Sequence, residues 1–194
     1  MKMKQCWLLV LLLSSVLTGC ARYTPDPIEV TAIAQHDRRA EAAISTDMVI
    51  EAAAKVALME KEAWQSEAHI VVNAYNGAVL VSGQAQTELI KQDIIEMIRR
   101  LDQVKMVHDH VLKDYPSNYV ERNNDAALLQ QLHAALSQIR TIPNFDSGMI
   151  KVIVEKSVVY LMGAVHRNEG AVVVNVVQHQ ANVKQIVMLF EYLD

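Results

Sequence analysis

The sequence predicts an α+β fold in which one small unit occurs twice in tandem. Two apolar segments, 70–83 (IVVNAYNGAVLVSG) and 150–163 (IKVIVEKSVVYLMG), align without a gap and both end in glycine. Each is preceded by an aspartate and a run with the apolar spacing of a helix. Each is followed by a second helical run and a last apolar run. Each unit is therefore expected to form a helix, two strands, a second helix and a third strand.

The first helix of each unit is predicted at 47–58 (DMVIEAAAKVAL) and 125–136 (DAALLQQLHAAL). Both segments begin with an aspartate that is followed by apolar residues at helical spacing. An aspartate carboxylate at an N-cap accepts hydrogen bonds from the free N–H groups of the first turn. We therefore expect Asp47 and Asp125 to be the N-caps of these helices.

Each unit is then expected to form a β-hairpin. Asn76-Gly77 lies between two apolar runs and is typical of a type I′ turn, in which both central residues have positive φ. Lys156 and Ser157 occupy the corresponding positions, and neither residue type favours positive φ. We therefore expect the second hairpin to use another turn or a looser one.

The second helix of the first unit is predicted at 89–101, where one stripe carries Ile90, Ile94, Met97, Ile98 and Leu101. Its counterpart, at roughly 167–180, is richer in valine. The third strands are predicted at 104–112 and 183–193. Because a domain of about 70 residues buries only a marginal core, we expect the two units to pack on each other.

The N-terminus has the features of a secretory signal. Lys2 and Lys4 precede an apolar run, CWLLVLLL, which is shorter than the about 20 residues of a transmembrane helix. The run ends in Leu17-Thr18-Gly19-Cys20, which resembles the lipobox of bacterial lipoproteins. This resemblance implies removal of residues 1–19, a diacylglycerol on the Cys20 thiol and an acyl chain on its new amine. The alternative is an ordinary signal peptide with a chance cysteine.

Residues 20–45 are predicted to be the lipidated N-terminus and a flexible tether, because they contain Pro25 and Pro27 and lack a sustained apolar pattern. Stable anchoring takes at least two lipid signals, and a lipoprotein carries three chains. In enterobacteria-like lipoproteins, aspartate after the lipidated cysteine favours the inner membrane. Ala21 at that position therefore favours anchoring in the outer membrane, facing the periplasm.

Cysteine content and charge exclude several classes of function. With Cys6 removed and Cys20 acylated, the mature chain has no thiol for a disulfide or for redox chemistry. Without Lys2 and Lys4, 16 basic residues remain against 22 acidic ones, and the net charge changes from −4 to −6. This balance, with no basic block, argues against a nucleic-acid partner.

The repeated pattern resembles the BON domain, most closely in AHIVVNAYNGAVLVSGQ (68–84) and VYLMGAV (159–165). Asp37-Arg38-Arg39 also resembles a D-R-R segment often found ahead of the first such domain. Together with the lipobox, the chain is similar to dual-BON outer-membrane lipoproteins, with domains at 46–115 and 116–194. The resemblance implies an α-β-β-α-β fold in each domain, with a small mixed three-stranded sheet and two helices.

The same resemblance implies a non-catalytic protein that supports envelope integrity, with no cofactor apart from the lipid on Cys20. In such lipoproteins the first helix of the second domain is associated with anionic phospholipid. The corresponding candidates for membrane contact here are Ala126, Ala127, Gln131, His133 and Arg140. Because 125–139 has no lysine or arginine, docking would depend on apolar insertion or on protonation of His133 at low pH.

Two other functions stay open at this point. One is an adaptor that binds an envelope assembly machine or a secreted client and uses the lipid only as a tether. The other is an enzyme, which would need a polar cleft with perturbed titratable groups. The sequence has no G-x-S-x-G elbow, phosphate loop or dinucleotide fingerprint, so no catalytic residue is predicted.

Several residues could serve more than one role. His108 and His110 would share one face of a strand and could hold a metal, but no third ligand is near in sequence, so a solvated strand face is the preferred interpretation. Trp64 is expected to contribute to the core or a domain contact rather than to a membrane anchor. Tyr115, Pro116 and Tyr119 lie between the units and are expected to fill their interface.

Overall fold

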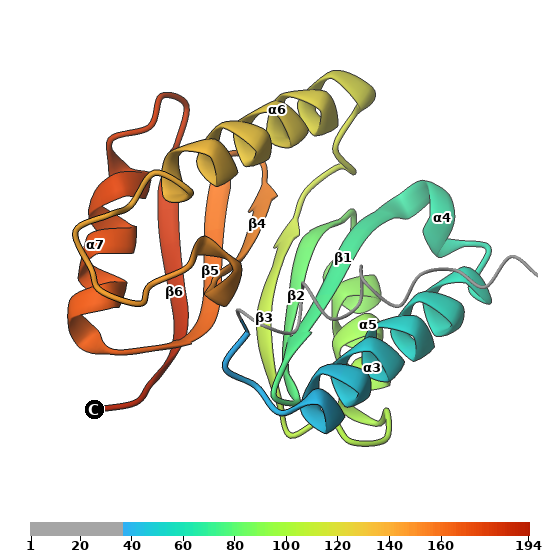
Figure 1. Cartoon of the computed structure of the whole chain (residues 1–194). Coiled ribbons are helices and arrows are strands. Elements are labelled where there is room, and N and C mark those ends of the chain that lie inside the picture. Colours follow the sequence, from blue (N-terminus) through green and yellow to red (C-terminus); the bar gives the residue numbers. More distant parts are fainter. Residues whose placement is uncertain (1–36) are drawn as a thin grey trace, which may run out of the picture. The chain divides into compact units, whose positions relative to one another are not determined.

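The computed structural model describes residues 37–194, which lie within one compact unit (Figure 1). The predicted signal peptide, Cys20 and most of the predicted tether lie outside the described residues. The first half contains α3 (Glu41–Met59), α4 (Trp64–Glu67), β1 (Ala68–Tyr75), β2 (Ala78–Ala85), α5 (Glu88–Arg99) and β3 (Met106–Lys113). The second half contains α6 (Tyr119–Leu136), the 3-10 helix η1 (Ser147–Met149), β4 (Lys151–Glu155), β5 (Val158–Val165), α7 (Arg167–Gln178) and β6 (Gln185–Tyr192).

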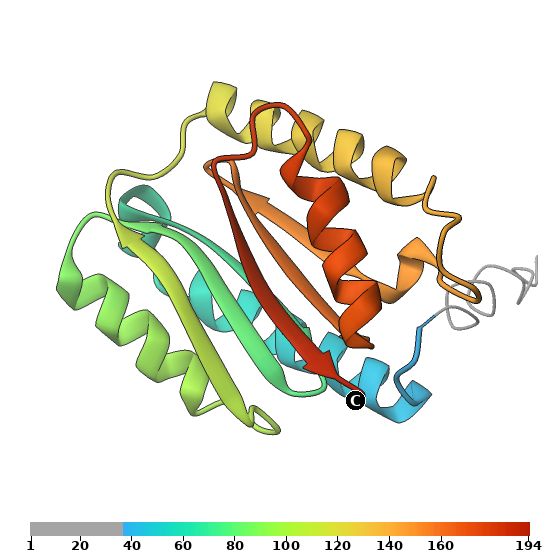
Figure 2. The ribbon, with the colours of Figure 1, turned by 90° about the vertical axis from the view of Figure 1, so that its left-hand side faces the viewer.

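Each half folds around a three-stranded mixed sheet. The middle strand, β2 or β5, pairs antiparallel with the strand before it and parallel with the third strand. The two sheets face each other, and the long helices lie on their outer sides (Figures 1 and 2). The predicted α+β fold with small mixed sheets is therefore confirmed. The short helices α4 and η1 are additions that the sequence did not predict.

Asp47 and Asp125 are not N-caps, so that prediction was wrong. α3 begins after Ala40, which makes no side-chain cap. α6 begins after Asn118, whose side chain accepts a hydrogen bond from the N–H of Glu121 while the Glu121 side chain accepts one from the N–H of Asn118. Both aspartates instead lie buried within their helices.

Each buried aspartate binds the turn of the hairpin beneath its helix. The Asp47 carboxylate accepts hydrogen bonds from both N–H groups of the Asn76-Gly77 turn, at 2.7 and 2.8 Å. The Asp125 carboxylate accepts them from Lys156 and Ser157, at 2.7 and 2.9 Å. Lys156 and Ser157 both have positive φ, 49° and 63°, so the second hairpin has the same two-residue turn as the first. The expectation of another turn was wrong because two charge-assisted hydrogen bonds offset the cost of positive φ.

Three clusters of buried side chains form the core. One lies between the helices and the sheet of the first half and includes Ile50, Val81 and Ile94. Its counterpart in the second half includes Leu132 and Val173. The third lies between the two sheets and consists of Tyr75, Leu80, Ile153, Tyr160, Met162 and Ala164. The two halves therefore pack on each other, as their small size predicted.

The matching glycines, Gly83 and Gly163, each allow a close approach of the backbone opposite them, which belongs to β1 at Gly83 and to η1 at Gly163. A Cβ on Gly83, which has a φ of +121°, would lie 1.9 Å from the backbone oxygen of His69. A Cβ on Gly163 would lie 2.6 Å from the backbone oxygen of Met149. Neither position has room for a side chain without movement of the backbone.

Candidate functional site

A buried polar cluster joins the two halves where the chain passes from β3 to α6. The Gln84 side chain donates a hydrogen bond to Glu155 at 2.7 Å and accepts one from the N–H of Ser117 at 2.8 Å. His69 lies 3.4 Å from the same Glu155 carboxylate. Burial alone would raise the pKa of Glu155, but hydrogen bonds from His69, Gln84 and Ser117 outweigh it and lower the pKa. The cluster therefore holds a charged carboxylate between the halves.

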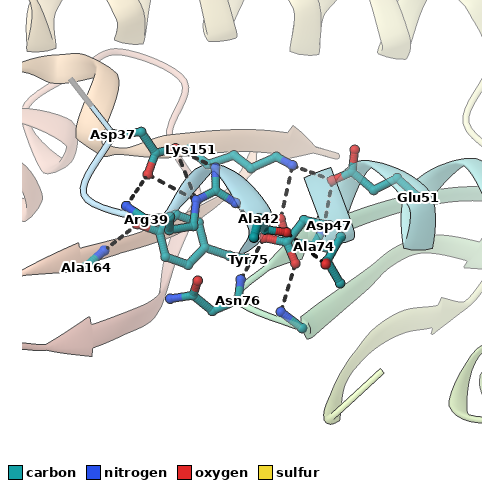
Figure 3. Close-up of polar contacts among 12 residues, drawn as sticks. Asp37, Arg39, Ala42, Asp47, Glu51, Ala74, Tyr75, Asn76, Lys151 and Ala164 are labelled. Carbon is teal, nitrogen blue, oxygen red and sulfur yellow. Dashed lines mark hydrogen bonds and ion pairs between the residues drawn. The ribbon is translucent and has the colours of Figure 1, made fainter. Parts of the chain in front are cut away.

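A second polar network lies where the described chain begins (Figure 3). Arg39 donates to Asp37 and, at 2.6 Å, to Asp47. Its guanidinium also lies over the Tyr75 ring, 4.1 Å from the centroid. The Tyr75 hydroxyl in turn accepts a hydrogen bond from the N–H of Ala164, in the second half, at 2.9 Å.

Arg38 connects the same segment directly to the second half. Its guanidinium donates two hydrogen bonds to Glu169, at 2.6 and 2.7 Å, and a third to the backbone oxygen of Ala164 at 3.0 Å. The hydrogen bond from Arg38 lowers the pKa of Glu169, with burial acting in the opposite direction. The Asp37-Arg38-Arg39 segment therefore binds both halves at once.

The His108-Asp109-His110 segment lies on β3 and does not form a metal cluster. No group of three or more potential ligands occurs among residues 37–194. His110 packs edge-on against Tyr160, with ring centroids 5.1 Å apart, and burial lowers its pKa, with a further contribution from His108. The preferred interpretation as a solvated strand face is therefore wrong for His110, which contributes to the contact between the sheets.

The five predicted membrane-contact residues are all exposed, but only four lie on α6. Ala126, Ala127, Gln131 and His133 are on the helix, and Arg140 follows it. Gln131 donates to Gln180 at 3.1 Å, while Arg140 donates to the backbone oxygens of its own turn. No helix in residues 37–194 is both long and apolar enough to cross a membrane.

The start of α6 carries an exposed aromatic surface, formed by tyrosines that were expected to lie in the interface between the halves. Tyr115 and Tyr119 are 75% and 72% exposed, so neither fills the interface between the halves as predicted. That interface is filled by Tyr75 and Tyr160 instead. The residues Leu112, Tyr115, Tyr119 and Val120, called here the α6-entry surface, are all exposed. The pattern Asn118-x-x-Glu121, typical of a capping box, would have identified the earlier helix start.

A groove of about 700 Å³ lies between α3, α4 and β1 in the first half. Its apolar lining consists of Met48, Ala52, Leu58, Met59, Trp64, Ala68, Ile70, Val71 and Val72. Trp64 also packs, half-buried, against the core of the first half, as predicted. The charged lining residues are Glu51 and Lys55, and His69 and Gln65 are polar. The lining of this groove is mainly apolar, as is typical of ligand-binding pockets in proteins.

Comparison with known proteins identifies similar chains. A family model described as the BON domain matches residues 46–112 and 124–194. The chain is 23% identical over 137 residues, 70% of its length and 69% of the relative's, to Outer membrane lipoprotein DolP of Haemophilus influenzae.

Two solved structures also resemble the chain. Both are of CdsD, described as a structural protein of the type III secretion system of Chlamydia trachomatis, and are 13% identical to this chain. They cover 76% of this chain and 92% and 98% of their own, with TM-scores of 0.32 and 0.31.

Proposed function

The chain belongs to the BON-domain family, and on that premise we propose that it is a non-catalytic lipoprotein of the outer membrane that supports envelope integrity. The observation that carries the proposal is its similarity, over 70% of the chain, to a protein named as an outer-membrane lipoprotein. Cys20, in its lipobox-like context, is the proposed attachment site of three acyl chains. The lipid anchor would hold both domains on the periplasmic side of the membrane.

We propose further that the membrane contact is made by the α6-entry surface and the adjoining face of α6. Tyr119 and Ala126 lie seven residues apart on this helix and therefore share one face. Exposed tyrosines are suited to the membrane interface because the ring is apolar and the hydroxyl can stay hydrated. Arg122 donates to the backbone oxygen of Ser117 at the helix start and is one nearby cation for anionic lipid. Apolar insertion, rather than charge, is the main contribution in this proposal.

The anchor is tested in cells with Cys20→Ala. In a deletion strain, the wild-type chain is expected to fractionate with the outer membrane and to restore detergent resistance, and Cys20→Ala is expected to do neither. Full restoration of resistance by Cys20→Ala would show that the anchor is dispensable and would favour a diffusible role.

The contact through α6 is tested by flotation of the Cys20→Ala protein with vesicles of phosphatidylglycerol or phosphatidylcholine. Tyr119→Ser is expected to reduce flotation with phosphatidylglycerol by about fivefold, because an aromatic side chain is removed from the contact. Leu89→Ser, which changes an exposed residue on α5, is the control. Equal flotation of the wild type and Tyr119→Ser would contradict contact through the α6-entry surface, and equal flotation with both lipids would show that anionic charge makes no contribution.

An adaptor function is the second candidate, because the groove between α3 and β1 is suited to a protein ligand. In this role the lipid would tether the domains while the groove binds an envelope protein or a secreted client. A protein partner in stoichiometric amount, without lipid binding by the unlipidated chain, would favour this candidate.

A further inference from the structure

The groove in the first half contains a strand edge with unused hydrogen-bonding groups. β1 is an outer strand of its sheet and pairs only with β2 among the described strands. The two-residue turn makes Tyr75 and Ala78 the closing, hydrogen-bonded pair of the hairpin. Because hydrogen-bonded and non-hydrogen-bonded pairs alternate along an antiparallel ladder, the backbone groups of Ala68, Ile70, Val72 and Ala74 point away from β2.

One end of this edge is already occupied. The N–H of Ala74 donates to the Glu51 carboxylate at 2.7 Å, and the backbone oxygen of Ala74 accepts from Lys151 at 3.3 Å. Lys151 and Glu51 are also paired with each other. These contacts confirm the outward direction of the alternate backbone groups. The N–H of Ala68 already donates to the backbone oxygen of Trp64 at the end of α4. Ile70 and Val72, which both line the groove, are therefore the available part of the edge.

The corresponding region of the second half has a longer connection between its first helix and its first strand. Its connection between the first helix and the first strand spans 137–150, whereas that of the first half spans 60–67. Ile142 and Phe145, from the longer connection, pack against the core of the second half. The groove of the first half is thus a feature of that half rather than a property of the repeated unit.

The charges at the groove favour an acidic ligand. Glu51 is paired with Lys151, and His69 lies beside Glu155. Lys55 lines the groove and makes no ion pair with any of the residues from 37 to 194. Within the described part of the chain, the exposed ammonium of Lys55 is therefore not held in an ion pair.

We propose that this groove binds an extended segment of a partner protein, which adds a strand to the free edge of β1. The backbone of such a segment would pair with Ile70 and Val72, and its alternate side chains would contact the apolar wall of α3 and Trp64. An acidic side chain of the segment would meet Lys55. An acyl chain could fill the same apolar space but could not pair with the strand edge. The proposal rests on the adaptor candidate and is independent of membrane contact through α6.

The test uses the full chain in nanodiscs of phosphatidylethanolamine and phosphatidylglycerol. A phage-displayed library of random nine-residue peptides is selected on these nanodiscs, and the most enriched sequence is synthesised as the probe. The probe is expected to have apolar residues at alternate positions and at least one acidic residue. Binding is expected to slow hydrogen exchange at the N–H groups of Ile70 and Val72. Methylation of the probe's edge-facing backbone nitrogens is expected to abolish binding.

Two neighbouring residues of α3 provide a matched pair of variants. Met48 lines the groove and is 65% exposed, whereas Val49 is 66% exposed and is not a lining residue. Met48→Glu is expected to weaken probe binding by about tenfold or more, and Val49→Glu by less than about twofold. Lys55→Glu is expected to weaken it similarly, and replacement of the probe's acidic residue by lysine is expected to restore binding to Lys55→Glu.

Several results would overturn the proposal. These are enrichment no greater than on empty nanodiscs, equal binding to wild type and Met48→Glu, or binding without protection of Ile70 and Val72. A rise of more than about tenfold in probe affinity after deletion of residues 28–34 would identify this chain's own segment as the occupant instead. Flotation of the same variants is measured in parallel, so that loss of membrane contact alone counts only against the α6 proposal.

Discussion

Single carboxylates determine much of the geometry at the residue scale. Asp47 and Asp125 each lie on a helix and each accept hydrogen bonds from two N–H groups of a turn that is distant in sequence. The second turn depends more strongly on its aspartate, because Lys156 and Ser157 are residues for which positive φ is unfavourable. In the first turn, Asn76 and Gly77 favour this conformation without help.

Asp125→Ala is expected to lower the free energy of unfolding by about 2–4 kcal/mol, because two partly buried N–H groups lose a charged acceptor. The measurement is urea denaturation followed by circular dichroism. In a background with Lys156→Asn and Ser157→Gly, the same change is expected to cost less, since the turn then forms by itself. Asp93→Ala, at an exposed position, is the control. Equal costs in the two backgrounds would contradict this explanation.

The ion pair between Arg38 and Glu169 makes the stability of the folded protein depend on pH. Its pKa in the folded protein is lowered from the usual 4.5 by the hydrogen bond from Arg38. The unfolded chain therefore binds a proton first as pH falls, so the stabilisation is complete above about pH 4.5 and is lost below it, through the lowered pKa. The stability difference between wild type and Glu169→Gln is expected to be constant from about pH 6 to 8 and to shrink below about pH 4.5. A difference that grows on acidification would contradict the ion pair.

At the element scale, the first hairpin depends on a close approach between its two strands. In the first half, the oxygen of His69 occupies the space where a side chain at Gly83 would begin. The absence of a side chain at Gly83 thus lets β1 pair closely with β2, and the opposite edge of β1 faces the groove. A disturbance at Gly83 would therefore reach the proposed binding edge through the backbone of β1.

Gly83→Ala is expected to lower the free energy of unfolding by about 3 kcal/mol or more, since both the positive φ and the 1.9 Å approach to His69 disfavour a Cβ. Gly163→Ala lacks the positive φ and is expected to cost less. Gly170→Ala, in α7, is the matched control: its Cβ would lie 3.4 Å from the rings of Phe190 and Tyr192, and alanine favours a helix by about 1 kcal/mol. A loss for Gly170→Ala as large as that for Gly83→Ala would contradict this ranking.

At the scale of the whole described molecule, the two halves share an interface that is apolar in the middle and polar at the sites described above. Tyr160 lies in the apolar part, where burial, assisted by nearby Glu155, raises its pKa to about 12. The polar contacts of Glu155 come from His69, Gln84 and Ser117, which belong to the first half or to the connection. The orientation of the halves therefore depends on directional contacts as well as on apolar packing.

Gln84→Met is expected to lower the free energy of unfolding by about 2–3 kcal/mol, because it leaves the N–H of Ser117 without its acceptor and removes a donor from Glu155. It is also expected to speed hydrogen exchange at Ser117, where the halves meet. The control is Gln86→Met, since Gln86 is partly exposed and its side chain makes only a long contact, 3.4 Å, to Ser66. Unchanged exchange at Ser117 would mean that Gln84 does not hold the connection.

The order of the elements could be predicted because periodic apolar spacing is local information. The role of Asp47 could not, since a carboxylate that caps a helix and one that binds a distant turn look alike in sequence. The tyrosines that fill the interface were predicted wrongly for a related reason. Whether Tyr75 or Tyr115 is buried depends on how the two sheets face each other, which no local pattern specifies. The groove likewise results from the short connection 60–67 and was not predicted.

The ion pairs formed by Arg38 and Arg39 have a mechanical consequence for a protein that is held by its N-terminus. These residues lie at the start of the described chain and hold Glu169 in one half and Asp47 in the other. A force applied through the N-terminal segment would therefore act on the interface between the halves before it acted on either hydrophobic core. If the anchor at Cys20 is pulled away from a bound partner, the contacts between the two halves would therefore be the first to break.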